Sequence, residues 1–287
     1  MTVDGTFNIH THGTESHGIG AYSIGGRGGQ GGDDTFFNPD AGEGGGTADS
    51  GDVFVTNRGT IETDQNESHG IVAQSVAGHA GSAGDSNSIV VFGAGGGSAG
   101  DGGEVTVDNR GDILTHGERA HAIFAQSIGG GGGSGGGGFS AFYSGGGSGG
   151  AGGNGSTVRV TNSATLTTER LDSRGIYAQS IGGAGGDGGD SGGIVAIGGR
   201  GSSTSDGGLV HVDNSGDIHS RAHAIFAESI GGGGGNGGDS SGWFSIGGTG
   251  GAGGAGGKVE VTNSGNLTTA QNNSYMEIGR ASCRERV

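Results

Sequence analysis

The chain has 287 residues, of which 79 are glycine and one is proline, and its formal net charge is −16. Only 29% of the residues are hydrophobic, too few for one thick globular core, and the acidic charge disfavours nucleic-acid partners because it repels phosphate backbones. Collagen is excluded because glycine has no strict period of three and proline is nearly absent. No stretch approaches the roughly 20 apolar residues that a membrane-spanning helix needs.

One apolar segment, followed by glycines, occurs in five copies about every 50 residues; the copy at 122–128 reads Ala-Ile-Phe-Ala-Gln-Ser-Ile. Such self-similarity predicts a repeat architecture in which each repeat buries its apolar stripe against the next. We expect an all-β fold, a parallel β-helix or β-solenoid with glycine-rich coils or loops. The expected repeats cover roughly 1–52, 53–104, 105–157, 158–209 and 210–258, with a partial repeat at 259–276.

Each repeat has the same elements in the same order. An alternating strand with inward valines ends in Asn, at 53–57, 105–109, 158–162, 210–214 and 259–263. A turn such as Asn57-Arg58-Gly59 follows, where Asn and Gly tolerate left-handed dihedrals. Short strands come next, at 61–63, 113–115, 166–168 and 218–220. A polar loop then leads to the apolar segment, whose Ile123 and Ala125 share one face of a third strand.

The glycine-rich remainder of each repeat contains a small apolar island. The islands lie at 36–37, 89–92, 139–143, 194–197 and 243–246. A flexible linker has no need of them, so we interpret each island as a further strand. On this interpretation one repeat forms two coils of about 25 residues each.

Parallel stacking of repeats places equivalent residues in columns. The asparagine column holds Asn57, Asn109, Asn162, Asn214 and Asn263, and the isoleucine column holds Ile71, Ile123, Ile176 and Ile225. Two coils per repeat would separate the asparagines by about 10 Å, twice the strand spacing. Direct amide ladders would instead require one coil per repeat, with the glycine segment looped out.

Two further columns carry rings. His17, His69, His121 and His223 precede the third strand, with Arg174 in the remaining copy. Two intervening coils would keep these imidazoles too far apart to share a metal, so we interpret the column as a polar turn position. The aromatic residues Phe124, Tyr177 and Phe226 are expected to be buried under the glycine-rich coil; the alternative is an exposed stripe that binds sugars or proteins. His10, His12 and His17 give only a minor indication of a metal site.

The tripeptide Arg110-Gly111-Asp112 matches the sequence that integrin-type receptors bind. In register with the other repeats, however, it is the Asn-x-Gly turn, and we favour that interpretation. The tripeptide stays a candidate receptor site because an exposed turn is accessible to a receptor.

Two other motifs indicate chemistry that the rest of the sequence does not support. Residues 189–193 match the nucleophile segment of trypsin-like serine proteases, but no companion His motif accompanies them. Residues 28–33, 185–190 and 234–239 fit the first six positions of a calcium-binding nonapeptide but lack its later apolar residue. We therefore expect no catalytic residue and no resident cofactor or metal, with calcium as the one candidate cation.

Residues 277–287 break the composition and have no counterpart in the repeats. They resemble the translation of a short-read sequencing adapter, which would make Cys283 an artefact.

The two recurring motifs, Gly/Ala-Ile-x-Ala-Gln/Glu-Ser-Ile-Gly-Gly-Gly and Val-x-Val-x-Asn, resemble the glycine-rich repeats of autotransporter passenger regions, the type V secretion family of Gram-negative bacteria. The resemblance runs from about Val3 to Ser274, and the first copy, with Gly20 and Tyr22, departs most. It implies a parallel β-helix that is exported through its own C-terminal outer-membrane barrel and stays tethered to the cell surface. No signal peptide or barrel pattern occurs in the sequence, so we expect an internal fragment.

The expected function is that of a surface-exposed, structural and adhesive passenger segment without enzymatic activity. Its partners would be molecules of host or neighbouring-cell surfaces, held by many weak contacts. One alternative is an extracellular β-helix hydrolase or lyase, which would gather Asp, Arg and Lys in one groove. Another is a glycine-rich scaffold or ice-binding module, for which regular threonine columns are typical.

Overall fold

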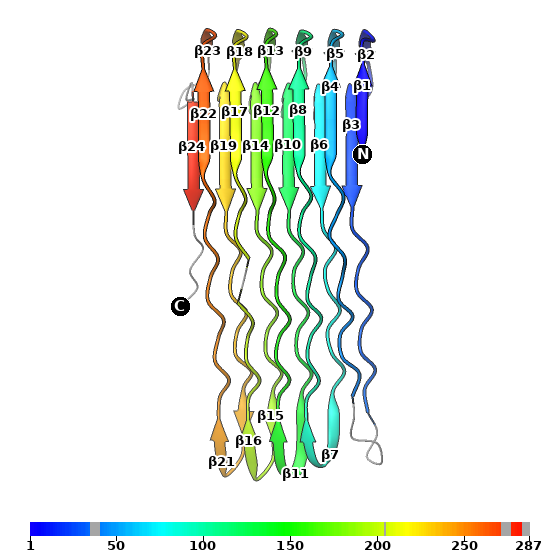
Figure 1. Ribbon diagram of the computed structural model, residues 1–287, viewed down its shortest axis with the longest axis vertical. Coiled ribbons are helices and arrows are strands. Elements are labelled where there is room, and N and C mark those ends of the chain that lie inside the picture. Colours follow the sequence, from blue (N-terminus) through cyan, green and yellow to red (C-terminus); the bar gives the residue numbers. More distant parts are fainter. Residues whose placement is uncertain (35–40, 204, 271–276, 283–287) are drawn as a thin grey trace.

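The computed structural model describes residues 1–34, 41–203, 205–270 and 277–282. Figure 1 shows a flat, elongated stack in which equivalent segments of successive repeats lie side by side. All regular elements of the described residues are strands, which confirms the expected all-β solenoid. In the same residues, no helix has the length and apolar character needed to cross a membrane.

Three six-stranded parallel sheets contain one strand from each coil. Sheet 1 consists of β1 (Thr2–Gly5), β4 (Val53–Asn57), β8 (Val105–Asn109), β12 (Val158–Asn162), β17 (Val210–Asn214) and β22 (Val259–Asn263). Sheet 2 consists of β2 (Ile9–Thr11), β5 (Ile61–Thr63), β9 (Ile113–Thr115), β13 (Leu166–Thr168), β18 (Ile218–Ser220) and β23 (Leu267–Thr269). Sheet 3 consists of β3 (Ile19–Ile24), β6 (Ile71–Val76), β10 (Ile123–Ile128), β14 (Ile176–Ile181), β19 (Ile225–Ile230) and β24 (Glu277–Ser282).

A fourth sheet lies at the other end of the long axis and contains the apolar islands (Figure 1). Its strands are β7 (Ser86–Phe92), β11 (Gly138–Gly145), β15 (Ser191–Gly192), β16 (Val195–Ile197), β20 (Ser240–Ser241) and β21 (Phe244–Ile246). Four of the five islands are thus confirmed as strands, and the first, at 36–37, lies outside the described residues. We call sheets 1 to 3 the head, sheet 4 the tip, and the glycine-rich runs between them the slab.

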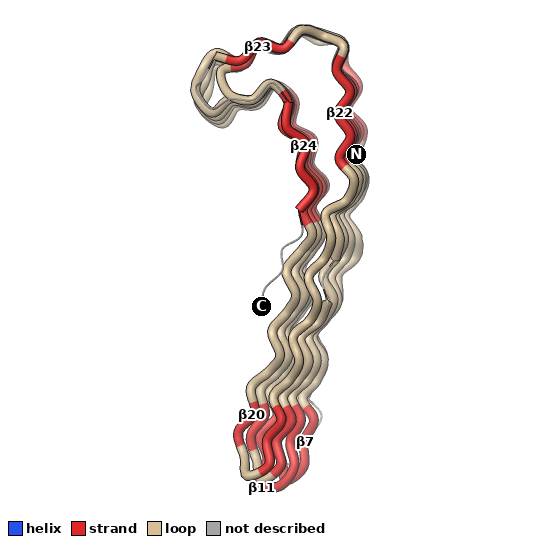
Figure 2. The backbone as a smooth tube through the Cα atoms, turned by 90° about the vertical axis from the view of Figure 1, so that its left-hand side faces the viewer, coloured by secondary structure: helices blue, strands red, loops and turns tan. Residues whose placement is uncertain are grey.

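The number of coils per repeat differs from our expectation: one repeat forms one coil, not two. Figure 2 shows why, since the chain leaves the head, runs along the slab to the tip, and returns along a second layer. The island is therefore the far end of the same coil. The glycine segment is also not a separate loop, because its two runs pack on each other over their whole length.

The asparagine column forms a direct amide ladder. Asn57 Nδ2 donates to Asn109 Oδ1 at 2.8 Å, and the three following steps, to Asn162, Asn214 and Asn263, measure 2.7 Å each. A second ladder, which the sequence did not lead us to expect, joins Gln74, Gln126 and Gln179 at 2.9 and 2.8 Å. Adjacent coils are therefore fixed in register by side chains as well as by strand pairing.

Aliphatic columns fill the head. Ile71, Ile123, Ile176 and Ile225 are fully buried, and each pairs directly with its equivalent in the next coil. The valines of sheet 1 and the isoleucines of sheet 2 complete one continuous core. Each such side chain contributes about 1.5–3 kcal/mol through burial.

The slab has no such core, and its chain follows a three-residue period. In the run 129–137, a Cβ on Gly129, Gly132 or Gly135 would lie within 2.2 Å of a carbonyl oxygen in the return run of the same coil. A Cβ on Gly130 or Gly133 would meet a carbonyl of the previous coil within 2.1 Å. Two faces of every turn therefore hold glycine or, as at Ala77, Ala80 and Ser205, a small side chain, and the third faces solvent. This period is that of a polyproline II helix.

The N–H groups of this run find their hydrogen-bond acceptors with the same three-residue period. Gly132 donates to Ala184 in the next coil at 2.9 Å, and Gly133 donates to Gly97 in the return run of the previous coil at 2.9 Å. The solvent-facing N–H groups bond to side chains of the previous coil, as Gly137 does to Asp85 Oδ1 at 2.7 Å. Buried backbone groups are thus paired without regular secondary structure.

Our expectation of left-handed dihedrals at the Asn-x-Gly turn is wrong. No described glycine has a positive φ; the positive values belong to Glu15, Glu67, Arg119 and Asp172 in the loop between sheets 2 and 3. Glycine is favoured at Gly111 because an added Cβ would lie 2.0 Å from the carbonyl oxygen of Gly59, although the next coil holds Ala164 at the equivalent position.

Candidate binding faces

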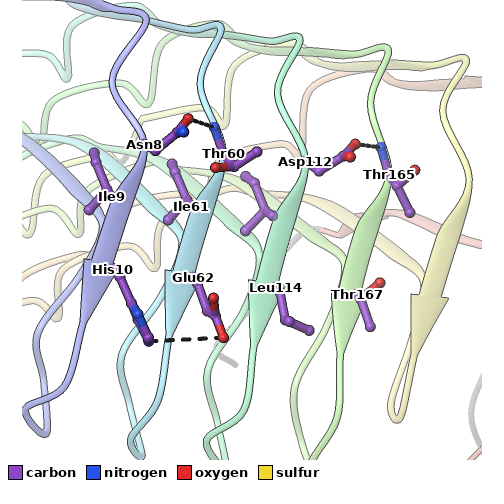
Figure 3. Close-up of a pocket in the computed structure, with 11 residues that line it drawn as sticks. Asn8, Ile9, His10, Thr60, Ile61, Glu62, Asp112, Leu114, Thr165 and Thr167 are labelled. Atoms are coloured by element: carbon purple, nitrogen blue, oxygen red, sulfur yellow. Dashed lines mark hydrogen bonds and ion pairs between the residues drawn. The ribbon is translucent and has the colours of Figure 1, made fainter.

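A groove runs across the strands on the outer face of sheet 2. It consists of two hollows of about 470 and 480 Å³, and both include Thr167 in their lining. Figure 3 shows the first hollow, with two rows of residues from successive coils along it. Because every coil contributes equivalent positions, the groove follows the axis of the stack.

The groove is lined by two mixed columns, in which threonine alternates with charged and apolar residues. The first contains Asn8, Thr60, Asp112 and Thr165, and the second contains His10, Glu62, Leu114 and Thr167. Their asparagine and aspartate side chains bind backbone: Asn8 accepts from the N–H of Thr60 at 3.2 Å, and Asp112 accepts from the N–H of Thr165 at 2.9 Å.

The candidate receptor tripeptide lies at the edge of this groove. Arg110 is bonded to Asp108 at 2.7 Å, Gly111 is buried, and Asp112 is engaged by the next coil. The tripeptide is thus part of the stacked Asn-x-Gly turn, and its use by a receptor stays a prediction.

Histidine and carboxylate side chains gather where β2, β5 and β9 end. His10 Nε2 lies 2.9 Å from Asp64 Oδ1, and His12 Nδ1 lies 2.5 Å from Asp64 Oδ2. On the other side, His116 Nε2 lies 3.0 Å from Glu62 Oε1, and its Nδ1 lies 2.8 Å from an oxygen of Glu169. These residues come from four successive coils, so the stacking register brings them together.

The histidines of this cluster are hydrogen-bonded to its carboxylates, and these contacts shift the pKa values of Asp64 and His116. Hydrogen bonds from His10 and His12 hold the pKa of Asp64 below its ordinary value. The pKa of His116 is raised, chiefly by its hydrogen bond to Glu169 and further by Glu62. Imidazole and carboxylate in one cluster form a donor set that suits zinc-type cations.

The histidine column is a stack of rings, which corrects our expectation of well-separated imidazoles. Ring centroids lie 5.0 Å apart between His17 and His69 and 4.9 Å apart between His69 and His121. Nδ1 of His17 accepts a hydrogen bond from the backbone N–H of His69 at 3.2 Å, and Nδ1 of His69 accepts one from the backbone N–H of His121 at 2.9 Å. The rings must be neutral to accept these bonds.

Burial keeps these imidazoles neutral. Desolvation, with a smaller effect of the neighbouring ring, lowers the pKa of His69 to about 4 and that of His121 to about 2. Arg174 takes the same place one coil later and lies 4.7 Å above the ring of Tyr177.

The aromatic residues beside this column lie on the outer face of sheet 3. Phe124, Tyr177 and Phe226 are half-buried, with ring centroids 5.2 and 5.3 Å apart. They pack against the histidine column, so the expectation that the glycine-rich coil covers them is wrong.

Most of the large exposed apolar side chains of the described residues lie at the tip. They are Ile89, Val90, Phe92, Phe139, Phe142, Ile194, Trp243, Phe244 and Ile246. Trp243 is 90% exposed. Four successive coils contribute to this apolar row, which occupies the end of the molecule opposite the head (Figures 1 and 2).

The protease-like and calcium-like motifs occupy the slab and the base of the tip. Ser191 is only 2% exposed, a poor position for a nucleophile. Asp190 accepts from the N–H of Asp239 at 2.8 Å, and Asp33 accepts from the N–H of Asp85 at 3.0 Å. The aspartates of the incomplete nonapeptides therefore satisfy backbone groups of the next coil. Calcium binding by the chain stays a prediction.

The predicted asparagine and isoleucine positions are structural, and the structure brings each set together in its own column. Sequence reasoning missed the groove, the His10–Asp64 contact and the exposure of the tip. The first two are readable from the sequence once one coil is known to span about 52 residues, because His10 and Glu62 then fall in register.

Comparison of the chain with protein-family models, with curated proteins and with solved structures gives no match.

Proposed function

We propose that the chain is a surface-exposed passenger segment of an autotransporter, with a structural and adhesive role and without catalytic activity. The observation that carries this proposal is the apolar row at the tip. It holds nine large side chains from four coils at the end of the molecule farthest from the head.

A row of exposed apolar side chains indicates a surface that binds a partner. Proteins seldom leave such surface in water, and larger patches mark interaction sites. Here the slab separates the row from the core of the head, so the row contributes little to the folding of the head. Because each coil adds a similar set of side chains, weak contacts at the tip act together and raise the avidity.

The location rests on the resemblance of the repeats to autotransporter passengers. In this proposal the chain is exported through its own C-terminal barrel and stays at the cell surface, where its tip contacts molecules of host or neighbouring cells. Brief protease treatment of intact source cells tests the location. The proposal expects loss of the chain without lysis, whereas survival of the chain until the cells are broken would contradict it.

The adhesive role is tested by replacing two exposed residues of the tip that lie in a coil with a neighbour on each side. Beads coated with the chain should adhere to cultured epithelial cells or to cells that display the chain, and Phe139→Ser with Phe142→Ser should reduce adhesion several-fold. The matched control is Phe7→Ser, because Phe7 is 74% exposed but lies in the head. Equal adhesion of the tip variant and the control would refute the role of the tip.

A further inference from the structure

We propose that His10, His12 and Asp64 form a binding site for one divalent transition-metal ion of the zinc type. The site lies on the head at the end of the axial groove, far from the tip, so it is independent of the proposed adhesive role.

The ligand atoms converge because of the stacking register. His10 and His12 belong to the first coil, and Asp64 follows β5 in the second coil, directly beside them. One oxygen of Asp64 faces each imidazole, at 2.9 Å from His10 Nε2 and 2.5 Å from His12 Nδ1. One donor atom from each of the three residues lies within 4.8 Å of the other two, which is the spacing that a common ion requires.

Binding of an ion needs only a small rearrangement. Zinc lies about 2.0–2.2 Å from nitrogen and oxygen ligands, so tetrahedral donors are about 3.3–3.5 Å apart. The nitrogen–oxygen separations of 2.9 and 2.5 Å are those of hydrogen bonds and have to open by up to about 1 Å, and the ligand nitrogens of the two histidines lie within 4.8 Å of each other. His10 and His12 are exposed side chains at the surface of the stack, so their rings can turn without disturbing the buried columns.

The other groups of the cluster define the remainder of the site. Glu62 Oε1 lies 3.9 Å from His10 Nε2 and is the nearest candidate for a fourth ligand. His116 is the other candidate, because its ligand atom lies within 4.8 Å of those of Glu62 and Asp64, and its Nε2 already contacts Glu62 Oε1 at 3.0 Å. The carboxylates of Glu62 and Asp64 bring negative charge to one place, which a divalent cation would reduce.

The donor set selects the class of ion. Two imidazoles with carboxylate oxygen favour zinc, copper(II) or nickel(II), whereas calcium takes six to eight oxygen ligands. Zn²⁺ is therefore the appropriate probe, and Ca²⁺ serves as the comparison.

Calorimetric titration of the full chain, produced without an affinity tag and treated with chelator, tests the site. We expect one Zn²⁺ per chain and at least an approximately 10-fold weaker Kd for Asp64→Asn, because this change removes the carboxylate that both imidazoles contact. The control is His219→Ala, which removes an exposed histidine from the same face of sheet 2 and should leave Kd unchanged.

A second variant guards against loss of folding. His12 is the most exposed of the three ligands, with 72% of its side chain exposed, so His12→Gln should keep the fold and weaken binding by a similar factor. Zn²⁺ should raise the Tm of the unmodified chain and of His219→Ala but not that of the ligand variants. Absence of zinc binding by the unmodified chain, or equal Kd values for it and the two ligand variants, would overturn the proposal.

Discussion

The head and the slab stack the same coils in opposite ways. In the head, columns of Ile and Val fill the space between three sheets, and side-chain burial stabilises the stack. In most of the slab, glycine carbonyls of one run lie where a side chain of the next would begin, and the few side chains there are as small as those of Ala77 and Ser205. The head therefore depends on large side chains, and the slab depends on very small ones or none.

This difference shows that a glycine-rich segment can restrict the residue types at its positions as strongly as an aliphatic core does. The slab holds glycine or a very small side chain on two faces of every turn and accepts larger side chains on the third. A single methyl group should thus have opposite consequences at neighbouring residues, and the predictions below use that contrast.

The largest effect is expected from Gly183→Ala. A Cβ at this position would lie 1.8 Å from the carbonyl oxygen of Gly130, and backbone on both sides prevents relaxation. We expect a loss of more than about 3 kcal/mol in the free energy of unfolding, at the upper end of the cost of overpacking.

Gly233→Ala is the matched control, because no atom lies within 4 Å of its added Cβ. Ala184 already occupies the equivalent position one coil earlier. Urea unfolding of both variants provides the comparison, and equal stability of the two would contradict the close-packed slab.

The head should respond to the opposite change. Ile123→Ala removes a fully buried side chain from the middle of its column, so we expect a loss of about 3 kcal/mol from burial and cavity terms. Phe142→Ala at the tip, where the ring is exposed, should change the free energy of unfolding by less than about 0.5 kcal/mol. Thermal and urea melts measure both, and a larger effect at Phe142 would show that the tip has a core of its own.

The last effect concerns pH and lies in the head alone. The folded pKa values of His69 and His121 are lowered by burial, whereas in the unfolded chain both return to about 6.5. Their contribution is complete at neutral pH and is lost as the pH falls through 6.5 towards 4, because the unfolded state then binds more protons. Between pH 7 and 5 we expect a loss of about 2 kcal/mol for each of the two histidines.

Urea melts at the two pH values test this prediction. His69→Gln should flatten the dependence, because the variant removes one of the two neutral rings. A pH dependence that is identical in the variant would locate its origin elsewhere in the molecule.

The sequence predicted the local elements well and their stacking less well. Val53–Asn57 and Ile61–Thr63 were readable from alternation and turn residues, since these signals are local. The number of coils per repeat could not be predicted, because the island at 89–92 is expected to form a strand both in a separate second coil and at the far end of one long coil. The three-residue period of the slab was missed because it holds only within each glycine-rich run. Asp187 and Asp190 illustrate it: they are three residues apart, and each accepts a backbone N–H of the next coil.

The candidate sites depend on contacts between residues about 52 positions apart. His10 and Asp64 carry no shared local motif, so their contact follows only from the length of one coil. The exposure of Trp243 likewise depends on the return of the chain at the tip, which no pattern in the island itself specifies.

The side-chain caps described above all have one orientation: acceptors of one coil receive N–H groups of the following coil, as in Asp85 with Gly137 and Asp112 with Thr165. A cut across the stack therefore exposes these side-chain acceptors on one surface and their backbone N–H partners on the other, while the strands leave backbone donors and acceptors on both. Severed pieces rejoin front to back, because only that pairing restores these hydrogen bonds. The stack therefore has a direction along its axis.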